Sequence, residues 1–147
     1  MVPIDGGYIG NCKGINYSIE NFLGPNNDGY YPDYNPDWSL KNRSSSKRLF
    51  ASVIYLAPGD YHRFHSPTDW YINRRRHFSG NLLSVRPSFV ARISNLFAIN
   101  ERAIYFGHWK YGMFTMAAVG ATNVGSINVF VDPVSVFFSF IEIYRKS

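Results

Sequence analysis

The sequence contains one cysteine among its 147 residues, Cys12. A disulfide needs two cysteines, so no covalent cross-link within the chain supports the fold. A lone cysteine fits a reducing compartment but does not select one. Neither a second cysteine nor a further histidine stands at zinc-ligand spacing, so we expect no metal site.

The sequence also lacks a long hydrophobic run. A membrane-spanning helix needs about 18 consecutive apolar residues, and the nearest candidate, residues 134–143, is shorter and follows Asp132 and Pro133. Residues 1–7 carry neither a basic region nor an arginine-rich amphipathic pattern, and both are marks of targeting segments. We therefore expect no targeting or transmembrane segment in this chain.

Apolar residues are abundant. They make up 46% of the chain and aromatic residues 18%, a composition typical of a globular protein rather than a disordered one. The formal net charge is +5 and the isoelectric point is about 9.4. This excess of positive charge favours anionic partners such as phospholipid headgroups or nucleic acid, without distinguishing between them.

Short apolar runs separated by glycine and proline predict a mainly β fold of the α+β class, a compact sheet domain with a few short helices. We predict a single domain over residues 1–147. Residues 25–47 are rich in asparagine, aspartate, serine and proline, so we predict a surface loop there. The predicted strands are 49–56, 70–72, 82–85, 102–106, 114–119 and 124–131, the fourth and fifth forming a hairpin, and the predicted helices are 17–23 and 88–96.

The densest cluster of reactive side chains follows the strand predicted at 49–56. Pro58 and Gly59 end that strand, which leaves His62 and His65 on a turn that a sheet can position. If the segment is extended, the two histidines point to opposite faces and have two separate roles; otherwise the chain bends between them. Histidines near a turn are also common as hydrogen-bonding surface groups, and H-x-x-H alone is no metal signature.

Residues 55–67, Y-L-A-P-G-D-Y-H-R-F-H-S-P, resemble the hallmark segment of the phosphatidylserine decarboxylases. Three further motifs resemble that family in its order. A weaker match, K-G-I-N-Y-S-I-E-N-F-L-G at 13–24, lies upstream. The pattern is more similar to animal mitochondrial members than to bacterial ones. The three further motifs are R-R-H-F-S-G-N-L-L-S-V-R-P at 75–87, L-F-A-I-N-E-R at 96–102 and V-G-A-T-N-V-G-S-I at 119–127.

The resemblance implies a pyruvoyl-dependent carboxy-lyase of phospholipid biosynthesis. Such an enzyme converts phosphatidylserine to phosphatidylethanolamine and CO2, and its mitochondrial members are associated with the inner membrane. Members are zymogens that form the pyruvoyl cofactor from a serine in an L-G-S-T motif. Carried over by motif, His65 is the base of the self-cleavage and His62 acts in decarboxylation. An imidazole titrates near neutral pH and can transfer a proton in either direction.

The chain departs from the family because it contains no L-G-S-T. Ser126 belongs to V-G-S-I and is interpreted as structural, and Ser147 follows a lysine. We therefore expect a partial, β-subunit-like domain that is inactive alone and lacks the α-type subunit as its partner. A true end of the gene or a mis-assigned exon would each produce such a chain.

The second departure concerns the triad aspartate, which the family places in P-A-D-G. Pro3-Ile-Asp5-Gly6 resembles this element, but Asp5 stands only eight residues before Lys13, closer than in the family. Either Asp5 is the triad aspartate behind a shortened insert, or the resemblance is coincidental.

The basic run Arg74, Arg75 and Arg76 is a candidate for binding the anionic substrate headgroup, at about 1 kcal/mol per basic residue near an anionic surface. The alternative interpretation is that these arginines form a charged edge exposed to solvent. The alternative function is a non-catalytic relative that binds anionic lipid, which saturable binding to phosphatidylserine liposomes would reveal. A nucleic-acid module ranks last, because aromatic residues do not interleave with the basic ones. We expect the N-E-R triplet at 100–102 to be buried polar support.

Overall fold

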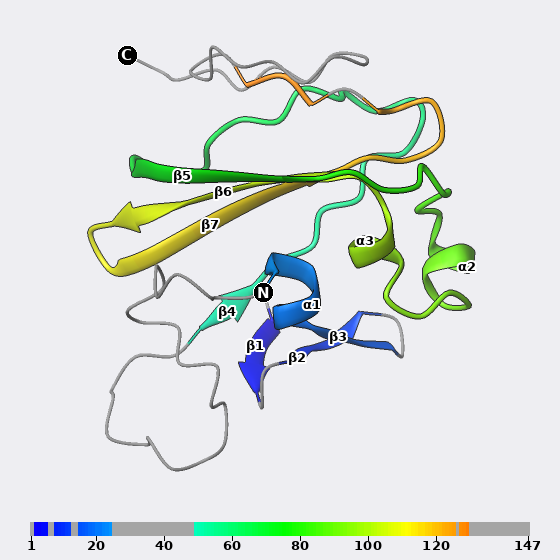
Figure 1. The fold of residues 1–147 in the computed structure, drawn as a ribbon, viewed down its shortest axis with the longest axis horizontal. Helices are drawn as coiled ribbons and strands as arrows, with labels where there is room; N and C mark the ends of the chain where they lie inside the picture. Colours follow the sequence, from blue (N-terminus) through cyan, green and yellow to red (C-terminus); the bar gives the residue numbers. More distant parts are fainter. Residues whose placement is uncertain (1, 6–7, 13–14, 25–48, 126, 130–147) are drawn as a thin grey trace. The chain divides into compact units, whose positions relative to one another are not determined.

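The structure is a computed structural model, and it describes residues 2–5, 8–12, 15–24, 49–125 and 127–129 (Figure 1). The chain forms two compact units. The first comprises residues 1–55 and 86–96, and the second comprises residues 56–85 and 97–147. The surface loop predicted at 25–47 lies outside the described residues.

The first unit contains a four-stranded antiparallel sheet in the order β3-β2-β1-β4. In the β1–β4 pair Val2 lies opposite Ala51. The strand predicted at 49–56 is wrong in its extent, because only two of its residues pair. Its β-branched residues are compatible with a strand, but a strand also needs a hydrogen-bonded neighbour, and none of the described strands pairs with 52–56. The four strands are β1 (Val2–Asp5), β2 (Tyr8–Cys12), β3 (Ile15–Ser18) and β4 (Phe50–Ala51).

The helix predicted at 17–23 is present as α1 (Ile19–Leu23). Ser18 caps its N-terminus by accepting a hydrogen bond from the Asn21 N–H at 3.3 Å. Gly24 ends it with a φ of 82°, a conformation that glycine adopts without strain. A helix of five residues is not stable in isolation, so packing of its buried residues Ile19 and Leu23 stabilises it.

The helix predicted at 88–96 is wrong in its extent. The chain forms α2 (Pro87–Val90), then turns, and then α3 (Leu96–Ile99). Pro87 starts α2, where its missing N–H costs no hydrogen bond. Asn95 takes a positive φ of 57° just before α3, and a left-handed residue cannot continue a right-handed helix.

The second unit contains the antiparallel sheet β5-β6-β7, formed by β5 (Tyr71–Phe78), β6 (Arg102–Trp109) and β7 (Gly112–Val119). The predicted hairpin is confirmed, because β6 and β7 pair in unbroken register around a two-residue turn. The strand predicted at 70–72 extends through the basic run as β5. The register of β5 against β6 shifts between Ile72 and Arg74, a β-bulge at which Asn73 is the extra residue.

One face of this sheet, which we call the covered face, carries the core of the second unit. Alternate residues of a strand point to the same face, and Ala103, Tyr105 and Ala118 on this face are buried. Ile127 and Val129 complete the cluster, and Phe64, Trp70 and Val124 pack against it. In Figure 1 the segments that contain these covering residues run along one side of β5-β6-β7.

The strands predicted at 82–85 and 124–131 are wrong for the residues that the structure describes. At 81–85 only Asn81 makes a bridge, with Asn100. The Leu83 backbone pairs with the Asn100 side chain instead of with a strand. Residues 127–129 reach the core through Ile127 and Val129 without joining a ladder, and residues 130–131 lie outside the described part. The mainly β class with few short helices is confirmed.

We predict that Gly107→Ala destabilises the protein by about 2 kcal/mol or more, because an added Cβ would collide with the Tyr71 carbonyl oxygen and lie 3.0 Å from Trp70 Cε3. The matched control is Gly59→Ala, since a Cβ there meets nothing within 4 Å. Its effect should stay within about 0.5 kcal/mol. Urea unfolding measures both, and equal midpoints for the two variants would contradict the close packing at Gly107.

Candidate active site

A tight turn precedes the two histidines. The Asp60 N–H donates to the Ala57 carbonyl at 2.8 Å. In return, the Ala57 N–H donates to the Asp60 carboxylate at 2.7 Å. Pro58 takes the second position of the turn, where its fixed φ is favourable. The turn is therefore closed by two hydrogen bonds, and the Asp60 carboxylate is used within it.

Exposure alternates residue by residue after this turn. Tyr61, Arg63 and His65 are exposed, whereas His62 and Phe64 are half-buried, and the alternation continues to Tyr71. This period of two is typical of an extended chain with one side on a core. As expected for an extended segment, the histidines lie on opposite sides, with His62 on the inward side.

Phe64 and Trp70 anchor the histidine segment, residues 56–70, to the covered face. The Trp70 ring meets Phe114 of β7 edge-on, with ring centroids 4.8 Å apart. The Trp70 indole N–H donates to Ser66 Oγ at 2.8 Å, and this hydroxyl donates to the Thr68 carbonyl at 2.6 Å. Sequence reasoning missed these positioning roles, since only the fold brings Phe114 to Trp70.

The tautomer of His62 follows from its hydrogen bond. Nδ1 lies 2.6 Å from the Asp60 carbonyl oxygen, and a carbonyl only accepts, so Nδ1 carries the proton. In the neutral ring Nε2 then has the lone pair. This nitrogen can take a proton as a base and return it as an acid.

His65 has a different environment. Its Nε2 lies 2.9 Å from the Tyr61 hydroxyl. The two ring planes are within 7° of parallel, with centroids 5.7 Å apart. A straight strand would separate residues four apart by about 13 Å, so the segment curves between them. The even spacing of Tyr61 and His65 was a signal in the sequence that they share a side, although it could not show the curvature.

The structure does not bring Arg74, Arg75 and Arg76 together on one face. After the bulge the strand alternates, which places Arg75 opposite Tyr105 on the covered face. Arg76 lies on the other face, its guanidinium 5.8 Å from the Phe106 ring centroid. All three side chains are half-buried, so they do not form a single exposed basic patch.

Asp5 belongs to the first unit, at the end of β1, where it lies opposite Tyr8 in the ladder. Its role as the triad aspartate stays a prediction. Among the described residues there is no group of three or more histidine, cysteine, aspartate or glutamate side chains that could hold a metal ion. No helix in the described ranges has the length and apolar character needed to cross a membrane.

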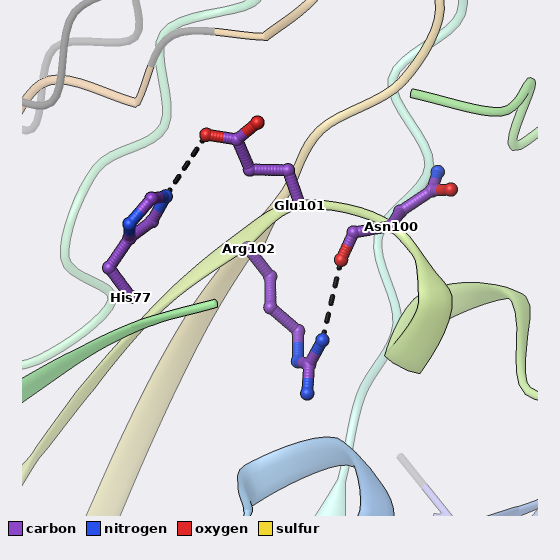
Figure 2. A network of polar contacts seen from close by, with 4 residues as sticks. All are labelled: His77, Asn100, Glu101 and Arg102. Carbon is purple, nitrogen blue, oxygen red and sulfur yellow. Dashed lines mark hydrogen bonds and ion pairs between the residues drawn. The ribbon is translucent and has the colours of Figure 1, made fainter. Parts of the chain in front are cut away.

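The N-E-R triplet forms a polar network in which Asn100 and Arg102 are buried, as expected, and Glu101 is half-buried (Figure 2). The Asn100 side chain is fully buried. It accepts from the Leu83 N–H at 3.1 Å and donates to the carbonyls of Leu83 at 2.8 Å and Gly120 at 2.9 Å. Glu101 pairs with His77 of β5 at 3.0 Å. These contacts tie three separate stretches of chain to the start of β6.

Arg102 completes this network from inside the protein. Its Nη1 donates to the Ala98 carbonyl at 2.6 Å and to the Asn100 carbonyl at 3.4 Å, and its guanidinium lies 4.1 Å from the Phe78 ring centroid. Burial lowers the pKa of Arg102 below its ordinary value, because desolvation disfavours the charged form. The carbonyls and the ring offset part of that cost.

Comparison with known proteins decides the family. A family model described as phosphatidylserine decarboxylase matches residues 1–138. The chain belongs to the phosphatidylserine decarboxylase family. The match includes every motif that carries the resemblance, and His62 and His65 lie within it.

Curated relatives of this decarboxylase-family chain are named as mitochondrial phosphatidylserine decarboxylase proenzymes. The one from Cricetulus griseus is 47% identical over 146 residues, which cover 88% of this chain and 36% of the relative. The one from Rattus norvegicus is 49% identical over 126 residues, which cover 82% of this chain and 31% of the relative. Proenzyme 1 of Saccharomyces cerevisiae is 61% identical over 84 residues, which cover 57% of this chain and 17% of the relative. The chain thus spans about a third of the length of the first two relatives.

The L-G-S-T motif, whose serine is the expected source of the family's pyruvoyl group, does not occur in the printed sequence. Among the described residues, Ser66 is already hydrogen-bonded to Thr68 and Trp70.

We predict that Asn100→Ala destabilises this chain by about 3 kcal/mol, because it leaves the Gly120 carbonyl and both Leu83 backbone groups without their side-chain partner. Asn73→Ala is the matched control. Asn73 is exposed and has one contact, 3.2 Å to His108, so its loss should cost less than about 0.5 kcal/mol. Chemical denaturation compares them, and a smaller loss for Asn100→Ala would contradict the supporting role of the triplet.

Proposed function

We propose that this chain supplies the histidine-bearing part of a pyruvoyl-dependent phosphatidylserine decarboxylase, a carboxy-lyase that produces phosphatidylethanolamine and CO2. The observation that carries the proposal is the pair of histidines on one anchored segment inside the family match. His62 and His65 face opposite sides and have different hydrogen-bond partners. Two separate environments suit two separate proton-transfer tasks.

His65 is the base of self-cleavage in this proposal. Its exposed side chain is accessible to a serine from outside these residues, and a serine becomes an effective nucleophile only when a base accepts its proton. A base also needs an orienting group. Asp5 is the proposed aspartate, and Tyr61 is a hydroxyl that the structure places on His65 Nε2.

His62 is the group that acts during decarboxylation. With Nδ1 held by the Asp60 carbonyl, the proton transfer occurs at Nε2. When bound, the pyruvoyl group would supply an electron sink for the charge left by departing CO2. This chain's own contribution is to place an imidazole with Nδ1 protonated just after a turn that two hydrogen bonds close.

The substrate in this proposal is phosphatidylserine at an anionic membrane surface, and the protein partner is an α-type subunit with the L-G-S-T serine. The relatives' names as proenzymes support a cleaved precursor, and their names as mitochondrial support a location at the mitochondrial inner membrane. Arg74, Arg75 and Arg76 remain candidates for the substrate headgroup. Because the three arginines are divided between two faces of the sheet, at most two of them can act at one site.

We predict that the purified 147-residue chain releases no CO2 from phosphatidylserine, because no residue in it forms the cofactor. The measurement is release of labelled CO2 from phosphatidylserine labelled in the serine carboxyl group. Turnover above that of a boiled sample would contradict the proposal.

A chimera tests the histidine roles. In it, this chain replaces the matching segment of the Cricetulus griseus proenzyme, with which it shares 47% identity. We expect the chimera to cleave itself and to decarboxylate phosphatidylserine. His65→Ala should abolish self-cleavage, whereas His62→Ala should leave cleavage intact and lower decarboxylation by about 100-fold or more.

Arg92→Ala is the control, since Arg92 is exposed and lies outside the histidine segment. It should cleave and turn over like the parent chimera. Cleavage by the His65→Ala chimera would refute the role of that histidine as a base. Equal loss of turnover in the His62 and Arg92 variants would refute a specific role for His62.

A further inference from the structure

One end of the sheet β5-β6-β7 presents a cluster of aromatic and basic side chains. The start of β5 and the turn between β6 and β7 lie at the same end, because Tyr71 pairs with His108 and Trp109 pairs with Gly112 (Figure 1). We call this cluster the sheet-end patch. It consists of Tyr71, Ile72, His108, Trp109, Lys110 and Tyr111.

The patch exposes large apolar groups to solvent. Tyr71 is 73% exposed, Tyr111 is 65% exposed and Ile72 is 38% exposed. Tyr71 lies opposite His108 and Ile72 opposite Gly107, on alternate faces at this end of the sheet, and Tyr111 lies in the turn. Single exposed apolar residues are ordinary, but a group gathered at one place marks an interaction surface.

The rings in the patch are held in place by their neighbours. Tyr71 stacks on His108 with centroids 5.4 Å apart, and Trp109 meets Tyr111 edge-on at 4.8 Å. Lys110 Nζ lies 4.6 Å from the Tyr111 ring centroid. Binding through these rings therefore requires little ordering of side chains.

The patch itself carries positive charge, because Lys110 is its one lysine, arginine, aspartate or glutamate. Strands β5, β6 and β7 and the turn at 110–111 contain no aspartate or glutamate. The nearest acidic residue before β5 is the exposed Asp69, two residues before Tyr71. Lys110 is the cation in the turn, and its Nζ lies over the Tyr111 ring. An anionic partner complements this end of the sheet, and an acidic protein or lipid surface meets no repulsion from the strands.

We propose that the sheet-end patch docks the protein onto an anionic phospholipid surface. Tyrosine and tryptophan favour the boundary between headgroups and acyl chains, because each ring has an apolar body and a polar edge. Ile72 adds aliphatic area, and Lys110 reaches lipid phosphates. A single-stranded nucleic acid would need open ring faces for base stacking, and His108 and Lys110 already occupy one face of Tyr71 and Tyr111.

This docking surface is separate from the proposed catalytic histidines and does not need the cofactor. The 147-residue chain, which we expect to be catalytically inactive, should still bind vesicles. Failure of the chimera and failure of vesicle binding are therefore distinguishable results.

The test measures binding of the full 147-residue chain to vesicles by flotation, at an ionic strength of about 0.15 M. Vesicles of phosphatidylserine in phosphatidylcholine are compared with pure phosphatidylcholine. We expect binding to the first and at least about tenfold weaker binding to the second. Lys110→Glu should weaken binding about 30-fold, about fivefold for each unit of charge changed. The double variant Tyr71→Ser/Tyr111→Ser should weaken it about tenfold or more.

Two matched controls separate the patch from the net charge. Arg92→Glu reverses an exposed cation outside the second unit, and Tyr8→Ser removes a tyrosine that is 51% exposed on β2. Both should keep most of the parent's affinity. Circular dichroism checks that each variant has the parent's secondary structure, and only variants that pass are compared.

Three results would overturn the proposal. Absence of vesicle binding by the folded parent chain is the first. Equal weakening by Lys110→Glu and Arg92→Glu is the second, because it would show that only net charge matters. The third is binding to a single-stranded oligonucleotide that displaces the chain from vesicles and is lost in the Tyr71→Ser/Tyr111→Ser variant.

Discussion

The missing side chain at Gly107 is the constraint on which the second unit depends. It lets the Tyr71 carbonyl and the Trp70 ring lie directly against β6, where a Cβ would collide with them. Trp70 can then pack edge-on against Phe114 and hold the end of the histidine segment. The positions of His62 and His65 therefore depend on a glycine that takes no part in any chemistry.

The polar network around Asn100 serves the same unit by another means. A core made only of apolar contacts tolerates small sliding movements, whereas an amide with three backbone partners has one favourable position. Asn100 thereby fixes residues 81–83 and Gly120 against the start of β6. Glu101 and Arg102 extend the network to His77 and Ala98. One of the motifs that resemble the family thus supports the scaffold.

Local chemistry made several features predictable from the sequence. Ser18 and Gly24 delimit α1, and the turn at 110–111 lies between two apolar runs that pair as β6 and β7. The alternation of His62 and His65 followed from an extended chain. Strand extents were less predictable, because residues 52–56 and 82–85 have strand-like composition but pair with none of the described strands. Hydrogen-bonded partners far away in the chain, and not composition, decide where a ladder ends.

The sequence by itself determined the family and the mainly β class, and it marked His62 and His65 as candidate site residues, because motif identity and local turn chemistry depend on neighbours along the chain. Only the tertiary structure decided the contacts of those residues. It placed Tyr61 on His65 Nε2, divided the arginine run between two faces of β5, and gathered Tyr71, Lys110 and Tyr111 at one end of the sheet. The physical reason is that strand register and chain curvature bring distant residues together, and neither can be read from residue spacing alone.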